Sequence, residues 1–115
     1  MKLNEIYKAY NDSFSKGVLP YIKCQHCGNI YYYPRDNCPV CGGSAIEIMR
    51  SSGRGEIYSF TEFNKGYYGI ISLNDGFRAY MDISGSNPEI GQEIFVKFKN
   101  INGKILPYAE IENKS

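Results

Sequence analysis

Two pairs of cysteines constrain this sequence more than any other feature. Cys24 and Cys27 form one C-x2-C pair, and Cys38 and Cys41 form a second, with ten residues between Cys27 and Cys38. Because two residues separate the thiols of each pair, both sulfurs can point at one centre from a tight turn whose backbone amides donate to them. Two such turns facing each other make a closed tetrahedral site of four thiolates, which is the arrangement of a structural zinc site.

Other uses of the four cysteines are less favoured. Disulfides need an oxidising compartment, whereas the N-terminus lacks the apolar run of a signal peptide and indicates the cytoplasm. A redox C-x-x-C motif normally lies beside a βαβ unit, which this sequence does not predict. Iron also fits four thiolates and remains the less favoured metal. We predict zinc at the four cysteines, with His26 exposed beside them.

The first 17 residues predict an amphipathic helix. Apolar side chains recur there at the spacing of one helix face, at Leu3, Ile6, Tyr7, Tyr10 and Phe14. Asn4 is the expected N-cap and Gly17 the expected stop. Because an isolated helix of this length is marginal in water, its apolar face must pack on something. The rest of this chain is the favoured surface, and a partner protein is the alternative.

The chain changes character after the cysteines. Residues 18–50 hold both cysteine pairs, residues 51–53 read as a linker, and the remainder alternates between β-forming runs and turns. The five expected strands are 56–63, 67–73, 77–83, 93–98 and 104–111. Gly69 predicts a bend where a barrel closes, and Pro107 predicts an edge position or a bulge. Five antiparallel strands predict a small barrel of OB type, with an SH3-like barrel as the open alternative.

Composition weakens a role in binding nucleic acid. The chain has 13 Lys and Arg against 12 Asp and Glu, a net charge of +1, so it is not a strongly basic protein. Aromatic side chains that could stack on bases occur at Tyr31, Tyr32, Tyr33, Tyr58, Phe60, Tyr67 and Tyr68. Few cations lie among them, so packing between modules or against a protein is favoured. Binding of single-stranded nucleic acid stays the alternative function.

No sequence pattern predicts a catalytic centre. The chain has one His, and it shows no nucleophile–base pair, no motif of paired carboxylates and no glycine-rich phosphate loop. The segment 53–55 reads as linker and barrel closure. No run approaches the roughly 18 apolar residues of a membrane helix. We therefore predict that the chain is not an enzyme by itself and does not enter a membrane.

The order of these motifs resembles the "domain of unknown function thirty-five" family over residues 1–112. The segments that carry the resemblance are the N-terminal helix, 24–28, 33–42, 53–61 and 88–91. The resemblance implies a mainly β chain: an N-terminal helix (1–17), a rubredoxin-like zinc ribbon (18–50) and a five-stranded OB-fold barrel (54–112). The connection 84–91 departs from many OB-folds because it leaves little room for a helix.

The resemblance also implies an accessory role. Proteins of that family associate with acyl-CoA enzymes such as thiolases, hydroxymethylglutaryl-CoA synthases or hydratases. We therefore expect a non-catalytic scaffold subunit in a hetero-oligomer with a thiolase-like partner. CoA or acyl-CoA is a candidate ligand of the barrel. Arg54, Lys65 and Arg78 are candidates for holding its phosphates through charge-assisted hydrogen bonds.

Overall fold

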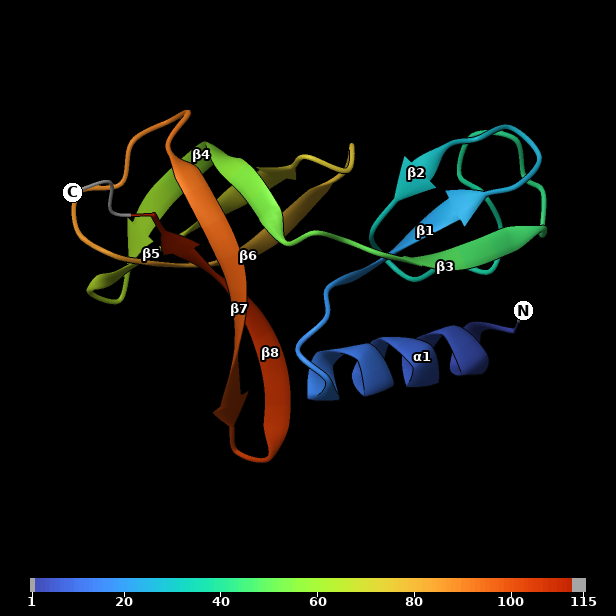
Figure 1. The fold of residues 1–115 in the computed structure, drawn as a ribbon, viewed down its shortest axis with the longest axis horizontal. Helices are drawn as coiled ribbons and strands as arrows, with labels where there is room; N and C mark the ends of the chain where they lie inside the picture. Colours follow the sequence, from blue (N-terminus) through green and yellow to red (C-terminus); the bar gives the residue numbers. More distant parts are fainter. Residues whose placement is uncertain (1, 113–115) are drawn as a thin grey trace.

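The computed structural model describes residues 2–112, which form one helix, a three-stranded sheet and a closed five-stranded barrel in chain order (Figure 1). The elements are α1 (Leu3–Ser15), β1 (Pro20–Cys24), β2 (Ile30–Tyr31), β3 (Ile46–Arg50), β4 (Arg54–Phe63), β5 (Gly66–Leu73), β6 (Arg78–Ser84), β7 (Glu93–Ile101) and β8 (Lys104–Ile111). The mainly β architecture predicted from the sequence is confirmed. Within residues 2–112, no helix has both the length and the apolar character needed to cross a membrane.

Helix α1 forms where the apolar spacing predicts it, but its N-cap is not Asn4. Lys2 occupies the cap position, and its backbone N–H donates to the Glu5 carboxylate at 3.1 Å. The helix therefore begins earlier than expected, and Asn4 lies inside its first turn. The Glu5 carboxylate, at the third helical position, accepts the hydrogen bond from the N–H of the cap residue Lys2. Gly17 follows the helix as predicted, and its N–H donates to the Phe14 carbonyl at 3.0 Å.

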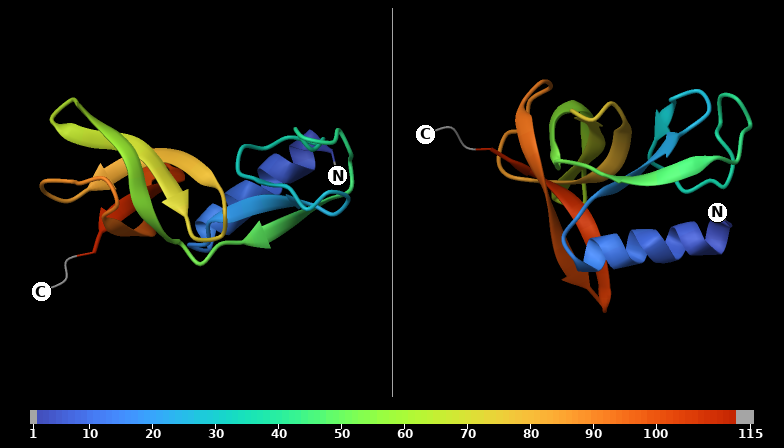
Figure 2. Two further views of the ribbon diagram at one scale, coloured as in Figure 1. Left: turned by 90° about the horizontal axis from the view of Figure 1, so that it is seen from above. Right: turned by 45° about the vertical axis from the view of Figure 1, so that its right-hand side comes forward.

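The apolar face of α1 packs mainly on this chain. Ile6 and Tyr10 are buried against the three-stranded sheet, and Phe14 reaches β7. The helix therefore lies along the sheet, and its C-terminal end meets the β7–β8 hairpin (Figure 2). Leu3 and Tyr7 remain 40% and 52% exposed. The favoured packing partner is confirmed, while Leu3 and Tyr7, on either side of the buried Ile6, leave part of the predicted face open to solvent.

The three-stranded sheet has the order β2-β1-β3 with antiparallel pairs throughout. Strand β1 is central, so Ile22 faces Tyr31 on one side and Ile48 on the other. Cys24, at the end of β1, pairs with Ile46, at the start of β3. The segment that contains the cysteines therefore begins and ends at the same end of the sheet.

The barrel has the strand order β4-β5-β6-β8-β7 and closes through pairing of β4 with β7. Four of its pairs are antiparallel, but β6 and β8 are parallel, with Ile83 opposite Ala109. The expectation of five antiparallel strands was therefore wrong at this pair, because β8 returns between β6 and β7 and runs in the direction of β6. A five-stranded Greek-key barrel of this order is an OB-fold, which excludes the SH3-like alternative.

Gly69 lies where β5 passes closest to β4. The β4–β5 register shifts between Ile57 and Ser59, and Gly69 pairs with Phe60 next to that irregularity. A Cβ atom on Gly69 would lie 2.2 Å from the Ser59 carbonyl oxygen. The sequence predicted a bend at the barrel closure for Gly69, but the barrel closes through β4 and β7. At Gly69 the structure has a close approach of two strands, which only glycine allows.

Pro107 occupies a local edge, as predicted. It pairs with Phe98 on β7, whereas the pairing of β8 with β6 begins at Tyr108. Its missing N–H therefore faces no third strand. Beyond this point β7 and β8 extend past the barrel as a two-stranded hairpin (Figure 1). The connection from β6 to β7 contains no helix, which agrees with the short 84–91 segment.

An aromatic stack joins the two β modules. The Phe77 ring, just before β6, lies between Tyr21 at a centroid distance of 5.0 Å and Tyr32 at 5.6 Å. The Tyr10 hydroxyl donates to the Tyr32 carbonyl, and burial raises the pKa of Tyr10, so the phenol keeps the proton it donates. The same contacts take Tyr32 out of the set of rings available for stacking on bases.

Candidate metal centre and its surroundings

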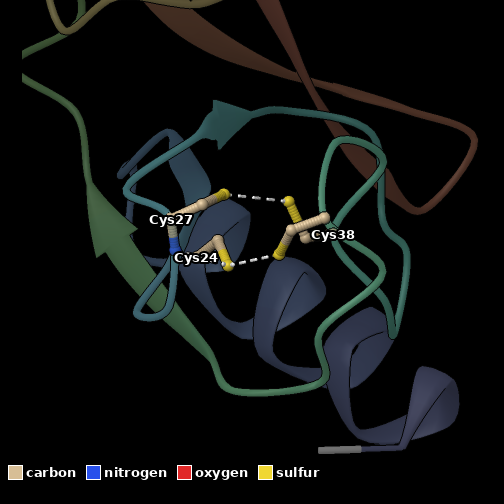
Figure 3. A group of neighbouring side chains, drawn as sticks. Cys24, Cys27 and Cys38 are labelled. Carbon is tan, nitrogen blue, oxygen red and sulfur yellow. Dashed lines mark hydrogen bonds between the residues drawn. The ribbon is translucent and has the colours of Figure 1, made fainter.

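The four cysteines converge at one end of the three-stranded sheet (Figure 3). Cys24 ends β1 and Cys27 lies in the turn after it, whereas Cys38 and Cys41 lie in the connection from β2 to β3. The Sγ atoms of Cys24 and Cys41 are 3.6 Å apart, as are those of Cys27 and Cys38. Each close pair joins one C-x2-C turn to the other, so the two turns face each other as the spacing predicts.

The two cysteine turns have the same backbone geometry. The Gly28 N–H donates to the Cys24 carbonyl at 2.9 Å, and the Gly42 N–H donates to the Cys38 carbonyl at 2.9 Å. Both glycines have positive φ, 79° and 74°. A glycine one position after the second cysteine thus lets each turn close behind its sulfurs.

Backbone amides point at the sulfurs. They donate from Cys27 to Cys24 at 3.5 Å, from Val40 to Cys38 at 3.4 Å and from Gly43 to Cys41 at 3.4 Å. The backbone N–H of Cys41, followed by that of Val40, lowers the pKa of the Cys38 thiol to about 6. The N–H of Cys27 similarly lowers the pKa of Cys24. These bonds favour the thiolate form, which is the form that binds metal, at Cys24 and Cys38. The pKa of Cys27 and of Cys41 is raised instead, because the backbone N–H bonds that these two thiols accept are outweighed by burial and the neighbouring sulfurs together.

The sulfur geometry fits zinc. All four Sγ atoms lie within 4.8 Å of one another, and the two closest pairs are at 3.6 Å. A tetrahedral site with Zn–S bonds of about 2.3 Å has sulfurs about 3.8 Å apart, whereas a disulfide needs about 2.05 Å. The cluster therefore suits four thiolates around one ion, with no coordination position left for substrate. Among residues 2–112 it is the one such group of potential metal ligands, and the exposed His26 does not join it.

The three cations predicted to contact CoA lie apart from the cysteines and have different neighbours. Arg54 forms an ion pair with Glu112 at 3.6 Å. The Arg78 guanidinium lies over the Tyr58 ring at 3.9 Å. Lys65 belongs to the tight turn between β4 and β5 and has a φ of 64°. The structure does not gather the three into one phosphate-binding cluster.

Two grooves combine residues singled out from the sequence, such as Tyr68 and Arg78, with others that were not, such as Tyr108. The larger, about 820 Å³, lies on the barrel and is lined by residues that include Tyr68 and Tyr108. There Lys99 pairs with Asp82 at 3.2 Å and lies 5.2 Å from the Tyr108 ring centroid. The sequence signal that could have indicated Lys99 is the alternation along the expected strand 93–98. Continued by one residue, this alternation places Lys99 on the outer face of the barrel.

The second groove, about 590 Å³, lies between the sheet and the barrel. We call it the inter-module groove. Its walls include Tyr31, Tyr33 and Arg35 from the first module and Phe77 and Arg78 from the second. Arg35 falls in the segment 33–42 that carries the family resemblance, but nothing in that segment indicates that Arg35 would line a groove together with Arg78.

Comparisons with known proteins agree with this fold. The family model described as the ChsH2 rubredoxin-like zinc ribbon domain matches residues 14–47. A DUF35 domain-containing scaffold protein of Methanothermobacter thermautotrophicus is 29% identical over 93 residues, which cover 69% of this chain and 70% of that protein. The chain is a relative of the DUF35 domain-containing scaffold proteins. The family resemblance carried by the cysteine segments and by residues 53–61 is thereby confirmed.

Other similar proteins are parts of enzymes. The benzoylsuccinyl-CoA thiolase subunit BbsA of Thauera aromatica is 30% identical to this chain over 81 residues, which cover 61% of the chain and 56% of the subunit. The match thus spans little more than half of that subunit. The solved Ltp2–ChsH2(DUF35) aldolase has a TM-score of 0.81, covers 96% of this chain and 98% of its own, and is 18% identical. At that identity the likeness shows the fold.

Proposed function

We propose that this chain is a zinc-binding, non-catalytic accessory subunit of an acyl-CoA-processing enzyme complex. The observation that carries the proposal is its similarity, across most of its length, to a protein named as a scaffold and to a thiolase subunit. The closed cysteine cluster supports it, because a four-thiolate zinc site stabilises a fold and offers no place for substrate.

In this proposal Cys24, Cys27, Cys38 and Cys41 hold the zinc ion. The metal supplies folding free energy to the ribbon, because the thiolates converge only when the two turns face each other. The chain's own contribution is to orient the sulfurs through backbone amides and to bury Cys24 and Cys38. Free thiols in this cluster suit a reducing compartment such as the cytoplasm.

We propose a thiolase-like enzyme as the partner, with a hydroxymethylglutaryl-CoA synthase or a hydratase as related choices. The exposed large apolar side chains support a hetero-oligomer, since such surface is common where another protein binds. They include Tyr33, Val40, Phe63, Tyr80 and Ile90. Rings that stay exposed next to a rigid core are typical of protein interfaces.

Contact with CoA is a finer proposal. Arg54, Lys65 and Arg78 have different neighbours and do not form one cluster. We therefore propose that a single one of the three binds a CoA phosphate. Isothermal titration of CoA into the purified complex should release heat, and one of the variants R54Q, K65Q and R78Q should reduce it. A complex that binds CoA equally with all three variants, or not at all, would contradict this contact.

Affinity purification tests the main proposal. The chain is tagged, expressed in its native cell and purified, with a tagged unrelated protein of similar size as the control. Mass spectrometry should identify an acyl-CoA enzyme of the thiolase type that is absent from the control. The isolated chain should hydrolyse or transfer no acyl group. Turnover by the chain alone would show an enzyme, and salt-sensitive binding of a fluorescent single-stranded oligonucleotide would favour the nucleic-acid alternative.

A further inference from the structure

The inter-module groove is a composite surface that neither module forms alone. Its walls are Tyr31, Tyr33, Arg35 and Pro39 on the ribbon side and Phe77 and Arg78 on the barrel side. Its volume is about 590 Å³. Tyr33 is 50% exposed, so a ring at the groove mouth is available to another molecule.

Contacts between the modules fix the groove in shape. The Tyr33 hydroxyl accepts a hydrogen bond at 3.2 Å from the backbone N–H of Tyr80 in β6. The Tyr32 ring stacks on Phe77 with an interplanar angle of 4°. Because both ties cross from one module to the other, the two walls are held in register before any partner binds, which lowers the ordering cost of binding.

The charge of the groove is positive. Arg35 and Arg78 line it and are exposed, and neither guanidinium forms an ion pair within residues 2–112. The Arg78 guanidinium lies over the Tyr58 ring at 3.9 Å, a contact that leaves its N–H groups free to donate to a carboxylate. Asp36 and Asp75 lie near the groove in sequence but are absent from its lining, and Asp75 accepts hydrogen bonds from Ser51 and Ser52. The groove thus combines apolar rings with two cations that lack a carboxylate.

We propose that the inter-module groove binds an extended, carboxylate-bearing segment of the acyl-CoA enzyme subunit. This inference rests on the proposed function and names the surface at which the partner docks. The tyrosine rings and Pro39 contact apolar atoms of the segment, while Arg35 and Arg78 each hold a carboxylate in a charge-assisted hydrogen bond. With Arg78 occupied in this way, the proposed CoA contact falls to Arg54 or Lys65. Tyr and Arg are the residue types that dominate binding at such sites. Two cations are too few to follow a nucleic-acid backbone.

The position of the groove ties docking to the metal site. Tyr31, Tyr33 and Arg35 all lie between Cys27 and Cys38, the second and third cysteines of the cluster. The four sulfurs anchor both ends of this segment. When the metal is removed, this wall loses its anchor, so the partner should dissociate even though the barrel wall remains.

Charge reversal tests the groove. The acyl-CoA enzyme captured with the wild-type chain is purified, and its affinity is measured by biolayer interferometry for wild type, Arg35→Glu, Arg78→Glu and the matched control Lys104→Glu at the far end of the β7–β8 hairpin. Each groove variant should weaken binding by about tenfold or more, and the control should not. Zinc content and near-ultraviolet circular dichroism should match wild type in all of them.

A photo-crosslinking residue at Tyr33 identifies the occupant. Irradiation of the complex should link Tyr33 to a partner peptide that contains Asp or Glu. Crosslinking to a second copy of this chain or to nucleic acid, or displacement of the partner by free CoA, would overturn the inference. So would equal affinity of wild type and both groove variants, which leaves the accessory function standing. Failure of the wild-type chain to capture any acyl-CoA enzyme would overturn the proposed function and this inference together.

Discussion

Replacement of Phe77 by alanine tests whether one ring joins the two modules. Phe77 is 5% exposed and lies between Tyr21 and Tyr32 of the ribbon, with ring planes at 26° and 4°. The substitution empties a buried site and removes both ring pairs. Core Phe-to-Ala changes cost about 3–5 kcal/mol in total, with the lost ring contacts included. We therefore expect a loss of about 4 kcal/mol in the free energy of unfolding.

Urea denaturation of the zinc-loaded chain measures this loss. With a slope of about 2 kcal/mol per molar urea, a loss of about 4 kcal/mol lowers the midpoint by roughly 2 M. Tyrosine signals in near-ultraviolet circular dichroism should also weaken, because Tyr21 and Tyr32 lose their common neighbour. Phe63→Ala is the matched control, since Phe63 is 67% exposed and its replacement should cost about 0.5 kcal/mol or less.

Two results would refute the reasoning about Phe77. One is a loss below about 1 kcal/mol, which would mean that the modules stay joined without the stacked ring. The other is an equal midpoint shift for Phe77→Ala and Phe63→Ala, which would mean that burial in the structure does not determine the cost.

Three further substitutions test local features. Cys38→Ser removes a buried ligand, so the purified chain should lose its zinc by elemental analysis; full retention of one ion would argue against a four-cysteine site. Lys65→Gly relieves a φ of 64° and should raise stability by about 1 kcal/mol; an unchanged or lower urea midpoint would contradict the strain. Gly69→Ala would place a Cβ 2.2 Å from the Ser59 carbonyl oxygen, so the barrel should not fold, and a cooperative transition near that of wild type would count against the close approach.

The metal site was predictable because its information is local. Two residues between thiols and a glycine after the second cysteine determine the turn, and the structure shows the same backbone bonds at Gly28 and Gly42. Gly69 was predictable only in part: a glycine inside a β-forming run indicated a bend at the barrel closure, whereas the structure has a close approach of β5 to β4 there. The family motifs then supported the order of the modules.

Features that depend on distant packing were not predictable. The parallel pairing of β6 with β8 depends on contacts between strands that are far apart in the sequence, because β8 lies between β6 and β7 in the barrel. Arg35 of the ribbon and Arg78 of the barrel line the same groove, although they are far apart in the sequence. At the start of α1, the Glu5 carboxylate accepts the hydrogen bond from the Lys2 N–H. The preference of Asn for the N-cap position did not reveal this arrangement.

Native mass spectrometry of the affinity-purified assembly tests the central claim most directly. The account predicts a hetero-oligomer whose mass is that of an acyl-CoA enzyme plus this chain with one zinc ion per copy, and denaturation should release a chain without disulfides. An assembly that contains this chain but no acyl-CoA enzyme, or a chain that carries no metal while bound to one, would contradict the account.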